Sequence, residues 1–203
     1  MKVSKLQYVT ANPAHAEQAC RGGVDWIQLR VKNKSEQEWK AIAEEAKAVC
    51  KKYGAKLIVN DSVRLAKMIG ADGVHLGKED MPPDEARALL GADFIIGGTA
   101  NTFEDIQRLS ILKVDYIGLG PFRFTQTKTN LSPLLGLQGY KDLMAECAGE
   151  NIRVPVIAIG GITLSDVEEI LAIGVYGLAV SSAISESGNI IETAKAFISK
   201  IKK

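Results

Sequence analysis

Short apolar runs alternate with amphipathic segments along the whole chain. Eight of these runs have the length and β-rich composition of buried strands, and they cover residues 6–10, 26–31, 56–60, 73–77, 94–99, 116–120, 154–160 and 177–183. The segments between them carry helix signals, such as the capping box formed by Ser35 and Glu38. Because strands that alternate with helices pair in parallel through right-handed crossovers, the pattern predicts an α/β fold.

The number of β/α units narrows the fold class further. Eight units fit either a closed (β/α)₈ barrel or an open doubly wound sheet. The count of eight favours the barrel, and so does the average of roughly 25 residues for each unit, which suits a compact barrel. We find no linker, low-complexity stretch or change of composition, so we expect residues 1–203 to form a single-domain (β/α)₈ TIM barrel.

Composition and charge exclude several kinds of partner. Lys and Arg number 25 and Asp and Glu 24, so the formal net charge of +1 gives no global attraction for nucleic acid or an anionic membrane. No apolar run approaches the roughly 20 residues of a spanning helix, and no signal-peptide core follows Met1. Three cysteines without metal-ligand spacing are typical of free thiols. We therefore expect a cytoplasmic protein that acts on small molecules, and a homo-oligomer is compatible with the sequence.

Polar side chains interrupt the second predicted strand. Within residues 26–32, period-two alternation turns the apolar positions 27, 29 and 31 toward the helices. The other face carries Gln28, Arg30 and Lys32 and points toward the barrel axis and its carboxyl-end mouth. Two buried cations cost several kcal/mol of desolvation unless an anion meets them. The pattern predicts an anionic ligand in the mouth; the alternative is an internal salt-bridge network.

Two acidic residues follow the third and fourth predicted strands. Asp61 and Asp80 both lie near the carboxyl ends of these strands, where barrel enzymes keep their chemistry. As a pair beside a cationic strand they could hold one Mg²⁺, with a substrate diphosphate completing the oxygen shell. The alternative is that each caps a helix or a turn, and Glu79 competes with Asp80 for the metal role.

The sixth predicted strand and the connection after it suggest a ligand pocket. Gly118 and Gly120 share one face of the strand, and their missing side chains predict room for a ligand in the mouth. The long connection over residues 121–135 shows no helical stripe, and long irregular loops are usually functional. It contains four residues that suit phosphate, Thr125, Gln126, Thr127 and Lys128. The alternative is an ordinary polar loop.

Small residues lie at the ends of the seventh and eighth predicted strands. Gly160 ends the seventh and Gly161 follows it, and Ser181 and Ser182 lie close to the end of the eighth. Barrels commonly build a phosphate site at this place, whereas the alternative is tight packing that only glycine permits. His75, in the fourth strand, is interpreted as a hydrogen-bonded core histidine and not as a catalyst.

Taken together, these motifs give the chain a resemblance to the thiamine phosphate synthase family over nearly its whole length. The matching stretches are QLRVK (28–32), ND (60–61), GADGVHLG (70–77), GP with TQTK (120–121 and 125–128), PVIAIGGI (155–162) and GLAVSSAI (177–184). They occur in the family's order and at its spacing. The set is specific, although no single stretch is.

The resemblance implies a (β/α)₈ enzyme with Mg²⁺ as cofactor. It would join 4-amino-2-methyl-5-diphosphooxymethylpyrimidine to a thiazole phosphate, giving thiamine phosphate and diphosphate. By motif position, the residues implied at the pyrimidine diphosphate are Gln28, Arg30, Lys32, Asn60, Thr99 and Lys128, and Leu29 and Val31 of the same stretch are implied to bind substrate. Those implied at the thiazole phosphate are Thr125, Gln126, Thr127, Gly161, Ser181 and Ser182.

The same resemblance implies how the groups divide the chemistry. Asp61 and Asp80 would bind Mg²⁺. Arg30, Lys32 and Lys128 would be catalytic, because positive charge beside the departing diphosphate eases C–O cleavage. The aminopyrimidine would support a carbocation that the thiazole nitrogen attacks, so no protein nucleophile is needed.

Two residues depart from the family pattern. The family usually has a serine after its fifth strand, where this chain has Thr99, which keeps the hydroxyl and adds a methyl group. Arg123, in the loop after the sixth strand, is bulkier and more cationic than the pattern predicts. We expect it either to add affinity for diphosphate or to face solvent.

Three other functions are weighed against the synthase. A thiazole tautomerase on the same barrel needs a proton shuttle, often histidine, near the loop after the sixth strand, and this chain has none there. A non-catalytic barrel that binds a phosphate ligand predicts a degraded metal pair, whereas both carboxylates are present. A tryptophan-pathway isomerase explains the glycines after the seventh strand but not Gln28, Arg30 and Lys32. The synthase is therefore favoured.

Overall fold

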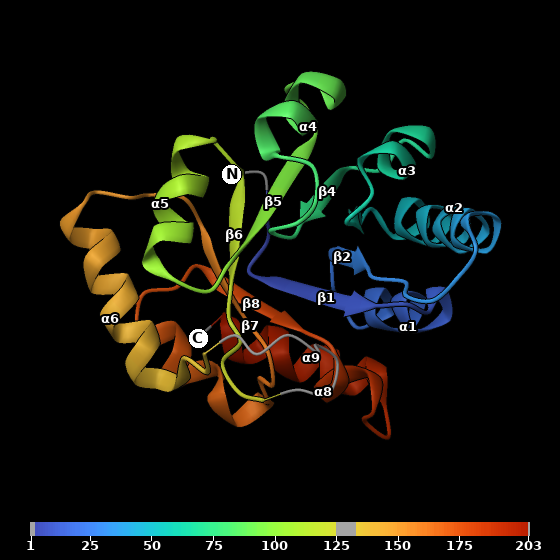
Figure 1. Ribbon diagram of the computed structural model, residues 1–203. Coiled ribbons are helices and arrows are strands. Elements are labelled where there is room, and N and C mark those ends of the chain that lie inside the picture. Colours follow the sequence, from blue (N-terminus) through green and yellow to red (C-terminus); the bar gives the residue numbers. More distant parts are fainter. Residues whose placement is uncertain (1–2, 125–132, 203) are drawn as a thin grey trace.

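Eight parallel strands form a closed barrel in the computed structural model, which describes residues 3–124 and 133–202. The strands are β1 (Leu6–Thr10), β2 (Trp26–Leu29), β3 (Lys56–Asn60), β4 (Gly73–Leu76), β5 (Ile95–Ala100), β6 (Tyr116–Leu119), β7 (Val156–Ile159) and β8 (Gly177–Val180). Each strand pairs with the next in the sequence, and β8 returns to β1, where Gln7 lies opposite Ala179. The predicted (β/α)₈ barrel is confirmed (Figure 1).

Helices connect the strands and surround the barrel (Figure 1). They are α1 (Pro13–Arg21), α2 (Glu36–Tyr53), α3 (Val63–Met68), α4 (Pro83–Leu90), α5 (Phe103–Ile111), α6 (Gly136–Gly149), the 3₁₀ helix η1 (Leu164–Asp166), α7 (Val167–Ala172), α8 (Ser182–Ser185) and α9 (Ile190–Ile201). The capping box predicted at Ser35 and Glu38 opens α2. Within the described ranges, no helix is both long and apolar enough to cross a lipid bilayer.

Period-two alternation divides the apolar residues between two layers. The outer layer, between strands and helices, includes Ile27, Leu29 and Val31 as predicted. The apolar side chains of the inner layer come from seven of the eight strands and include Trp26 and Tyr116, whose ring centres lie 4.9 Å apart, edge to face. A closed parallel barrel is therefore a packed core, and open space is left only at its ends.

Several predicted boundaries differ from the structure. β2 ends at Leu29 and not at residue 31, because its pairing with β1 ends where Thr10 lies opposite Leu29. β8 ends at Val180, since Ser182 already begins α8. Ser165 and Glu168 have the sequence spacing of a further N-terminal cap, but they do not form one.

The true N-cap of this region is Thr163, which forms a capping box with Asp166. The three cysteines, Cys20, Cys50 and Cys147, are free and buried, as expected.

Candidate active site

A chain of polar side chains runs up the inside of the barrel. Gln28 Nε2 donates to Gln7 Oε1 at 2.9 Å, and Gln7 Nε2 donates to the Tyr116 hydroxyl at 3.2 Å. The same hydroxyl lies 3.0 Å from His75 Nδ1, and His75 Nε2 lies 3.0 Å from Thr99 Oγ1. Burial raises the pKa of Tyr116, so its hydroxyl stays protonated. This series of hydrogen bonds fixes Gln28 and orients the hydroxyl of the half-buried Thr99. The interpretation of His75 as a hydrogen-bonded core residue is confirmed.

A cavity of about 240 Å³ lies at the carboxyl ends of β7, β8 and β1. Its walls are Val9, Thr10, Ala11, Arg30, Pro121, Ile159, Gly160, Gly161, Ile162, Ala179, Val180, Ser181 and Ser182. Four residues predicted at the site thus meet here, namely Arg30, Gly161, Ser181 and Ser182. Thr10 and Pro121 were not predicted as site residues; Thr10 ends β1 and Pro121 comes two residues after β6, and this position at a strand end is the signal that could have found them.

Arg30 is the cation of this cavity. Its backbone N–H donates to the Thr10 carbonyl at 2.9 Å, which fixes the chain just beyond β2. No carboxylate among the described residues forms an ion pair with its guanidinium. Other arginines are committed to the protein, as Arg87 is to Asp115 at 2.5 Å. A half-buried cation without such a partner is suited to an anionic ligand.

A second group of charges forms beside it at the ends of β3 and β4. Lys32 Nζ lies 3.2 Å from Asp61 Oδ2, so one ion pair of the alternative salt-bridge network does exist. Asp80 Oδ2 accepts the Gly77 N–H at 2.6 Å. Burial raises the pKa of Asp80; the Gly77 N–H opposes this shift, and the charge and hydrogen bond of Asp61 reinforce it. The carboxyls of Asp61 and Asp80 thus interact with each other, and the charge of Lys32 acts on both.

The capping alternative holds for Asp80 but not for Asp61. Ser62 is the N-cap of α3 and accepts the Leu65 N–H, so Asp61 does not cap that helix. Asp80 does close a turn onto Gly77. It is Asp80, and not the exposed Glu79, whose carboxyl interacts with Asp61.

The remaining predicted residues fall in several places. Asn60 is buried at the end of β3, opposite His75 in the sheet. The side chains of Leu29 and Val31 pack in the outer layer, so only their backbone groups could reach a ligand. The predicted residues Thr125, Gln126, Thr127 and Lys128 lie outside the described residues.

The two strand-six glycines do not leave open space, contrary to the prediction. A Cβ on Gly118 would lie 3.0 Å from Cε1 of His75, and one on Gly120 would lie 2.2 Å from the Ile159 carbonyl oxygen. Gly118 therefore makes room for the histidine, and Gly120 lets β6 approach β7 closely. Both glycines serve protein packing, and the ligand space lies instead over β7, β8 and β1.

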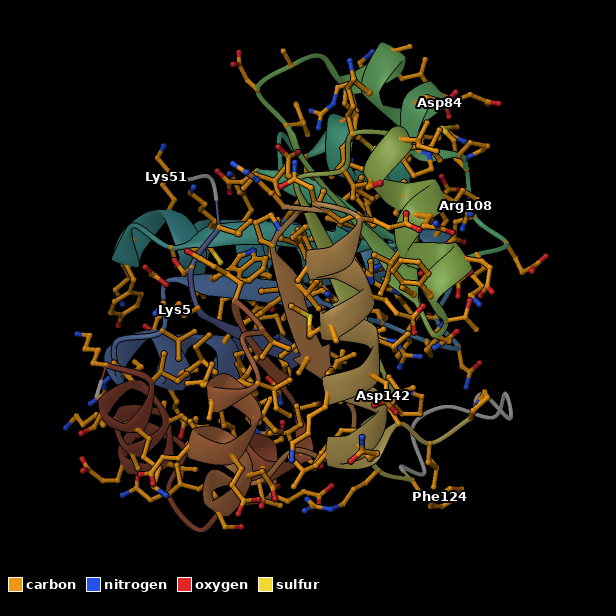
Figure 2. The ribbon with its side chains drawn as sticks, turned by 90° about the vertical axis from the view of Figure 1, so that its left-hand side faces the viewer. Lys5, Lys51, Asp84, Arg108, Phe124 and Asp142 are labelled. Carbon is orange, nitrogen blue, oxygen red and sulfur yellow. The ribbon has the colours of Figure 1, made fainter. Side chains whose placement is uncertain are left out.

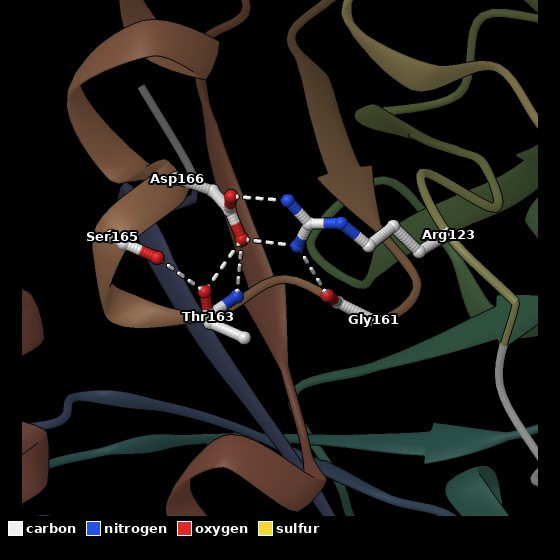
Figure 3. A network of polar contacts seen from close by, with 5 residues as sticks. All are labelled: Arg123, Gly161, Thr163, Ser165 and Asp166. Carbon is white, nitrogen blue, oxygen red and sulfur yellow. Dashed lines mark hydrogen bonds and ion pairs between the residues drawn. The ribbon is translucent and has the colours of Figure 1, made fainter.

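Arg123 is exposed, as one of the two expectations had it, but it is also paired with the protein; its contribution to diphosphate affinity stays a prediction. Its Nη1 and Nη2 each lie 2.5 Å from one oxygen of Asp166, and Nη1 also donates to the Gly161 carbonyl at 3.1 Å (Figure 3). The guanidinium carbon lies 4.6 Å from the centre of the Phe122 ring. The next residue, Phe124, is 72% exposed at the rim (Figure 2). Arg123 thus ties the loop after β6 to the turn after β7.

The Arg123–Asp166 pair should contribute to stability in a pH-dependent way. Hydrogen bonds from Arg123, helped by those from Thr163 and opposed by burial, hold the pKa of Asp166 at about 2. A carboxyl with a depressed pKa stabilises the fold above its unfolded pKa of about 4, and the effect is lost as pH falls toward the folded value. We expect the free energy of unfolding of wild type to exceed that of Asp166→Asn by at most about 2 kcal/mol between about pH 5 and 8.

Urea unfolding at a series of pH values measures this difference. It should shrink steadily below about pH 4. A difference that persists unchanged to about pH 2.5 would assign the loss to packing and not to the charge of Asp166.

Among residues 3–124 and 133–202, no group of three or more His, Cys, Asp or Glu side chains converges as a metal site. The Asp61–Asp80 pair is nevertheless a two-carboxylate donor set, and oxygen ligands are what Mg²⁺ prefers. Mg²⁺ usually takes one or two carboxylates and fills its octahedron with substrate phosphate and water. The pair therefore fits Mg²⁺ better than a metal that needs an all-protein cage.

Comparison with known proteins gives a consistent result. A family model described as thiamine monophosphate synthase matches residues 4–184. Thiamine-phosphate synthase from Flavobacterium johnsoniae is 52% identical over 190 residues, with 91% of this chain and 90% of that protein covered. The Bacteroides fragilis (strain YCH46) enzyme of the same name is 50% identical over 199 residues, with 95% and 98% covered.

A solved structure agrees with these relatives. Thiamine phosphate pyrophosphorylase from Pyrococcus furiosus superposes with a TM-score of 0.86 at 28% identity, covering 98% of this chain and 95% of that one. The family model spans the strands, the cavity and both carboxylates described above. The chain belongs to the thiamine monophosphate synthase family.

Proposed function

We propose that this chain joins 4-amino-2-methyl-5-diphosphooxymethylpyrimidine to a thiazole phosphate and releases diphosphate. The observation that carries the proposal is the cavity in which Arg30 faces Gly161, Ser181 and Ser182, beside the carboxylate pair. A cation, together with an acid pair that would hold Mg²⁺, suits a diphosphate, and a turn of small residues after β7 and β8 suits a second phosphate. The mouth can therefore hold two phosphorylated substrates together.

The chain's own groups would assist departure of the diphosphate. In the reaction, the bond from the pyrimidine methylene carbon to the diphosphate oxygen breaks, and a bond from that carbon to the thiazole nitrogen forms. Arg30 and Lys32 would neutralise the departing charge, as would Lys128 by its place in the family motif. Asp61 and Asp80 would hold Mg²⁺, which when bound supplies further charge neutralisation at the diphosphate.

The inner polar chain would position the pyrimidine. Gln7 donates to the Tyr116 hydroxyl, which leaves the Tyr116 proton to be donated to His75 Nδ1. In that arrangement His75 Nε2–H donates to Thr99, and the Thr99 proton stays available for an acceptor on the substrate. The hydroxyl that the family pattern places here would keep its direction, despite the extra methyl group of Thr99. Asn60 would complete the polar rim beside it.

The alternative functions have less support. The only histidines of the sequence are His15 and His75, and His75 is engaged inside the barrel, so a tautomerase would lack a shuttle near the loop after β6. A cytoplasmic location is also part of the proposal, supported by three buried cysteines that remain free. We further propose small-molecule substrates as the partners of the chain.

We expect the purified protein to release diphosphate only when both substrates and Mg²⁺ are present. The physical reason is that the leaving diphosphate comes from the pyrimidine substrate and the attacking nitrogen from the thiazole substrate. No protein side chain supplies either group. The measurement is a coupled diphosphate assay, with formation of thiamine phosphate followed by chromatography. Isomerisation of a thiazole substrate without any diphosphate would favour the tautomerase instead, and binding of phosphate ligands without turnover would favour the non-catalytic barrel.

A further inference from the structure

The loop after β6 extends along the end of β7 beyond the last strand residue. Phe122 N–H donates to the Ile159 carbonyl at 2.9 Å, and Arg123 N–H donates to the Gly160 carbonyl at 2.9 Å. The Arg123 side chain continues this ladder by one step, because Nη1 donates to the Gly161 carbonyl at 3.1 Å. The carbonyls of the last residue of β7 and of the two residues after it are thus held by one short segment.

The turn over residues 160–162, which these hydrogen bonds hold, has a restricted backbone conformation. Gly160 and Gly161 have φ of +101° and +68°, in the left-handed region that side chains rarely adopt. A Cβ on Gly161 would lie 2.8 Å from Cβ of Arg123, so the two segments are in close contact. Because C=O and N–H of a trans peptide point in opposite directions, a Gly161 carbonyl directed toward Arg123 directs the Ile162 N–H away from it. Gly160, Gly161 and Ile162 all line the cavity.

The carboxylate partner is fully engaged and nearly buried. The Asp166 side chain is 9% exposed. Besides both Arg123 nitrogens it accepts Thr163 N–H at 2.8 Å and Thr163 Oγ1–H at 2.7 Å (Figure 3). Thr163 opens η1, so Asp166 connects the guanidinium to the backbone on the far side of the turn. With two nitrogens engaged by Asp166 and Gly161, the guanidinium is committed to the protein.

We propose that Arg123 and Asp166 are positioning residues that set the direction of the turn over residues 160–162 and thereby the affinity for the phosphate of the thiazole substrate. The inference rests on the proposed function, since that substrate brings the second phosphate. Arg123 touches no reacting atom and acts through the Gly161 carbonyl. A lysine could not replace it, because one ammonium cannot hold both oxygens of Asp166 in the planar fork geometry and also reach Gly161.

The experiment varies one substrate at a time in Arg123→Met, Arg123→Lys and Asp166→Asn. We expect KM for the thiazole phosphate to rise about 10-fold, because a displaced binding group lowers affinity even when it is not itself removed. KM for the pyrimidine diphosphate should stay within about two-fold of wild type. The double variant Arg123→Met with Asp166→Asn should match either single variant, because both changes break one unit.

A matched control pair lies at the other end of the barrel. Arg87 Nη2 lies 2.5 Å from Asp115 Oδ2, and Arg87 Nη1 donates to the Phe94 carbonyl at 2.5 Å, before β5 begins. Arg87→Met breaks an arginine–aspartate pair of the same kind far from the cavity. This variant should lower the melting temperature. It should not raise KM for the thiazole phosphate relative to KM for the pyrimidine diphosphate.

Three outcomes would overturn the inference. A rise in KM for the pyrimidine diphosphate alone would mean that Arg123 binds that substrate directly. An effect of Arg123→Met without one of Asp166→Asn would mean that the pair is not a unit. Equal changes in both KM values, as a general loss of structure would cause, would also contradict it. If wild type releases no diphosphate, the proposed function fails, and calorimetric binding of the thiazole phosphate to wild type and Arg123→Met still tests the pair.

Discussion

Replacing Asp61 by Asn is expected to raise the Mg²⁺ concentration at half-maximal activity at least about 10-fold, and to lower kcat/KM at limiting Mg²⁺ by about 100-fold or more, since a carboxylate ligand supplies both charge and an oxygen. The substitution is conservative for the backbone. Asp61 has φ of +66°, and Asn tolerates the left-handed region as well as Asp does. The two side chains have nearly the same shape. The loss should therefore appear in the metal titration and not in the melting temperature.

Two further variants separate the roles of this cluster. Lys32→Met removes the ion pair to Asp61 but keeps both carboxylates, so it should raise KM for the pyrimidine diphosphate without raising the Mg²⁺ midpoint. Asp93→Asn changes an exposed carboxylate before β5, at the opposite end of the barrel. It should change neither the KM for the pyrimidine diphosphate nor the Mg²⁺ midpoint. An unchanged Mg²⁺ titration in Asp61→Asn would leave Asp61 only as the partner of Lys32.

The fold was predictable because its signal repeats eight times. Each strand is a short buried run between helix signals, and the predicted bounds of β1 and β3 agree with the structure residue for residue. The alternation also predicted which layer Gln28 and Leu29 enter, since a strand buried on both faces must still turn successive side chains to opposite sides. The ends of strands were less predictable, because pairing with a neighbour, and not composition, decides where β2 stops.

The site was predictable only in part. Sequence position at strand ends, together with the family motifs, indicated Arg30, Gly161, Ser181 and Ser182, which do line one cavity. Sequence position and motifs could not indicate which side chains from different strands and loops lie next to each other. The Arg123–Asp166 pair spans 43 positions, and nothing near Arg123 in the sequence indicates a carboxylate. The space beside Gly118 is filled by His75 from another strand, so a missing side chain did not mean an empty volume.

The same comparison explains why Arg30 is expected to act on a ligand directly, whereas Arg123 can act only through the groups of the protein that it holds. Arg123 and Arg87 each hold a carboxylate and a backbone carbonyl, and removing either arginine takes the charged partner away from that carboxylate. Arg30 has no such carboxylate among the residues that the structure describes. Loss of Arg30 should therefore have little effect on stability.

Arg30→Met is accordingly expected to lower kcat by about 100- to 1,000-fold, the loss of about 3 to 4 kcal/mol that follows removal of one group stabilising transition-state charge. Methionine keeps most of the apolar stem, so the melting temperature should change little. Steady-state diphosphate release and thermal unfolding, measured on the same preparation, check both expectations. Arg153→Met, at an exposed position just before β7 at the amino end of the barrel, is the matched control and should alter neither quantity.

If Arg30→Met instead destabilised the fold as Arg87→Met should, with turnover falling only in proportion to the folded fraction, Arg30 would be a structural cation. The anionic ligand inferred for the mouth would then lose its main support. A selective loss of turnover would place the departing diphosphate over β2, beside the carboxylates of β3 and β4. The turn after β7 would then be the binding site for the phosphate of the thiazole substrate. The role proposed for Arg123 depends on the two phosphate-bearing substrates binding at these separate places.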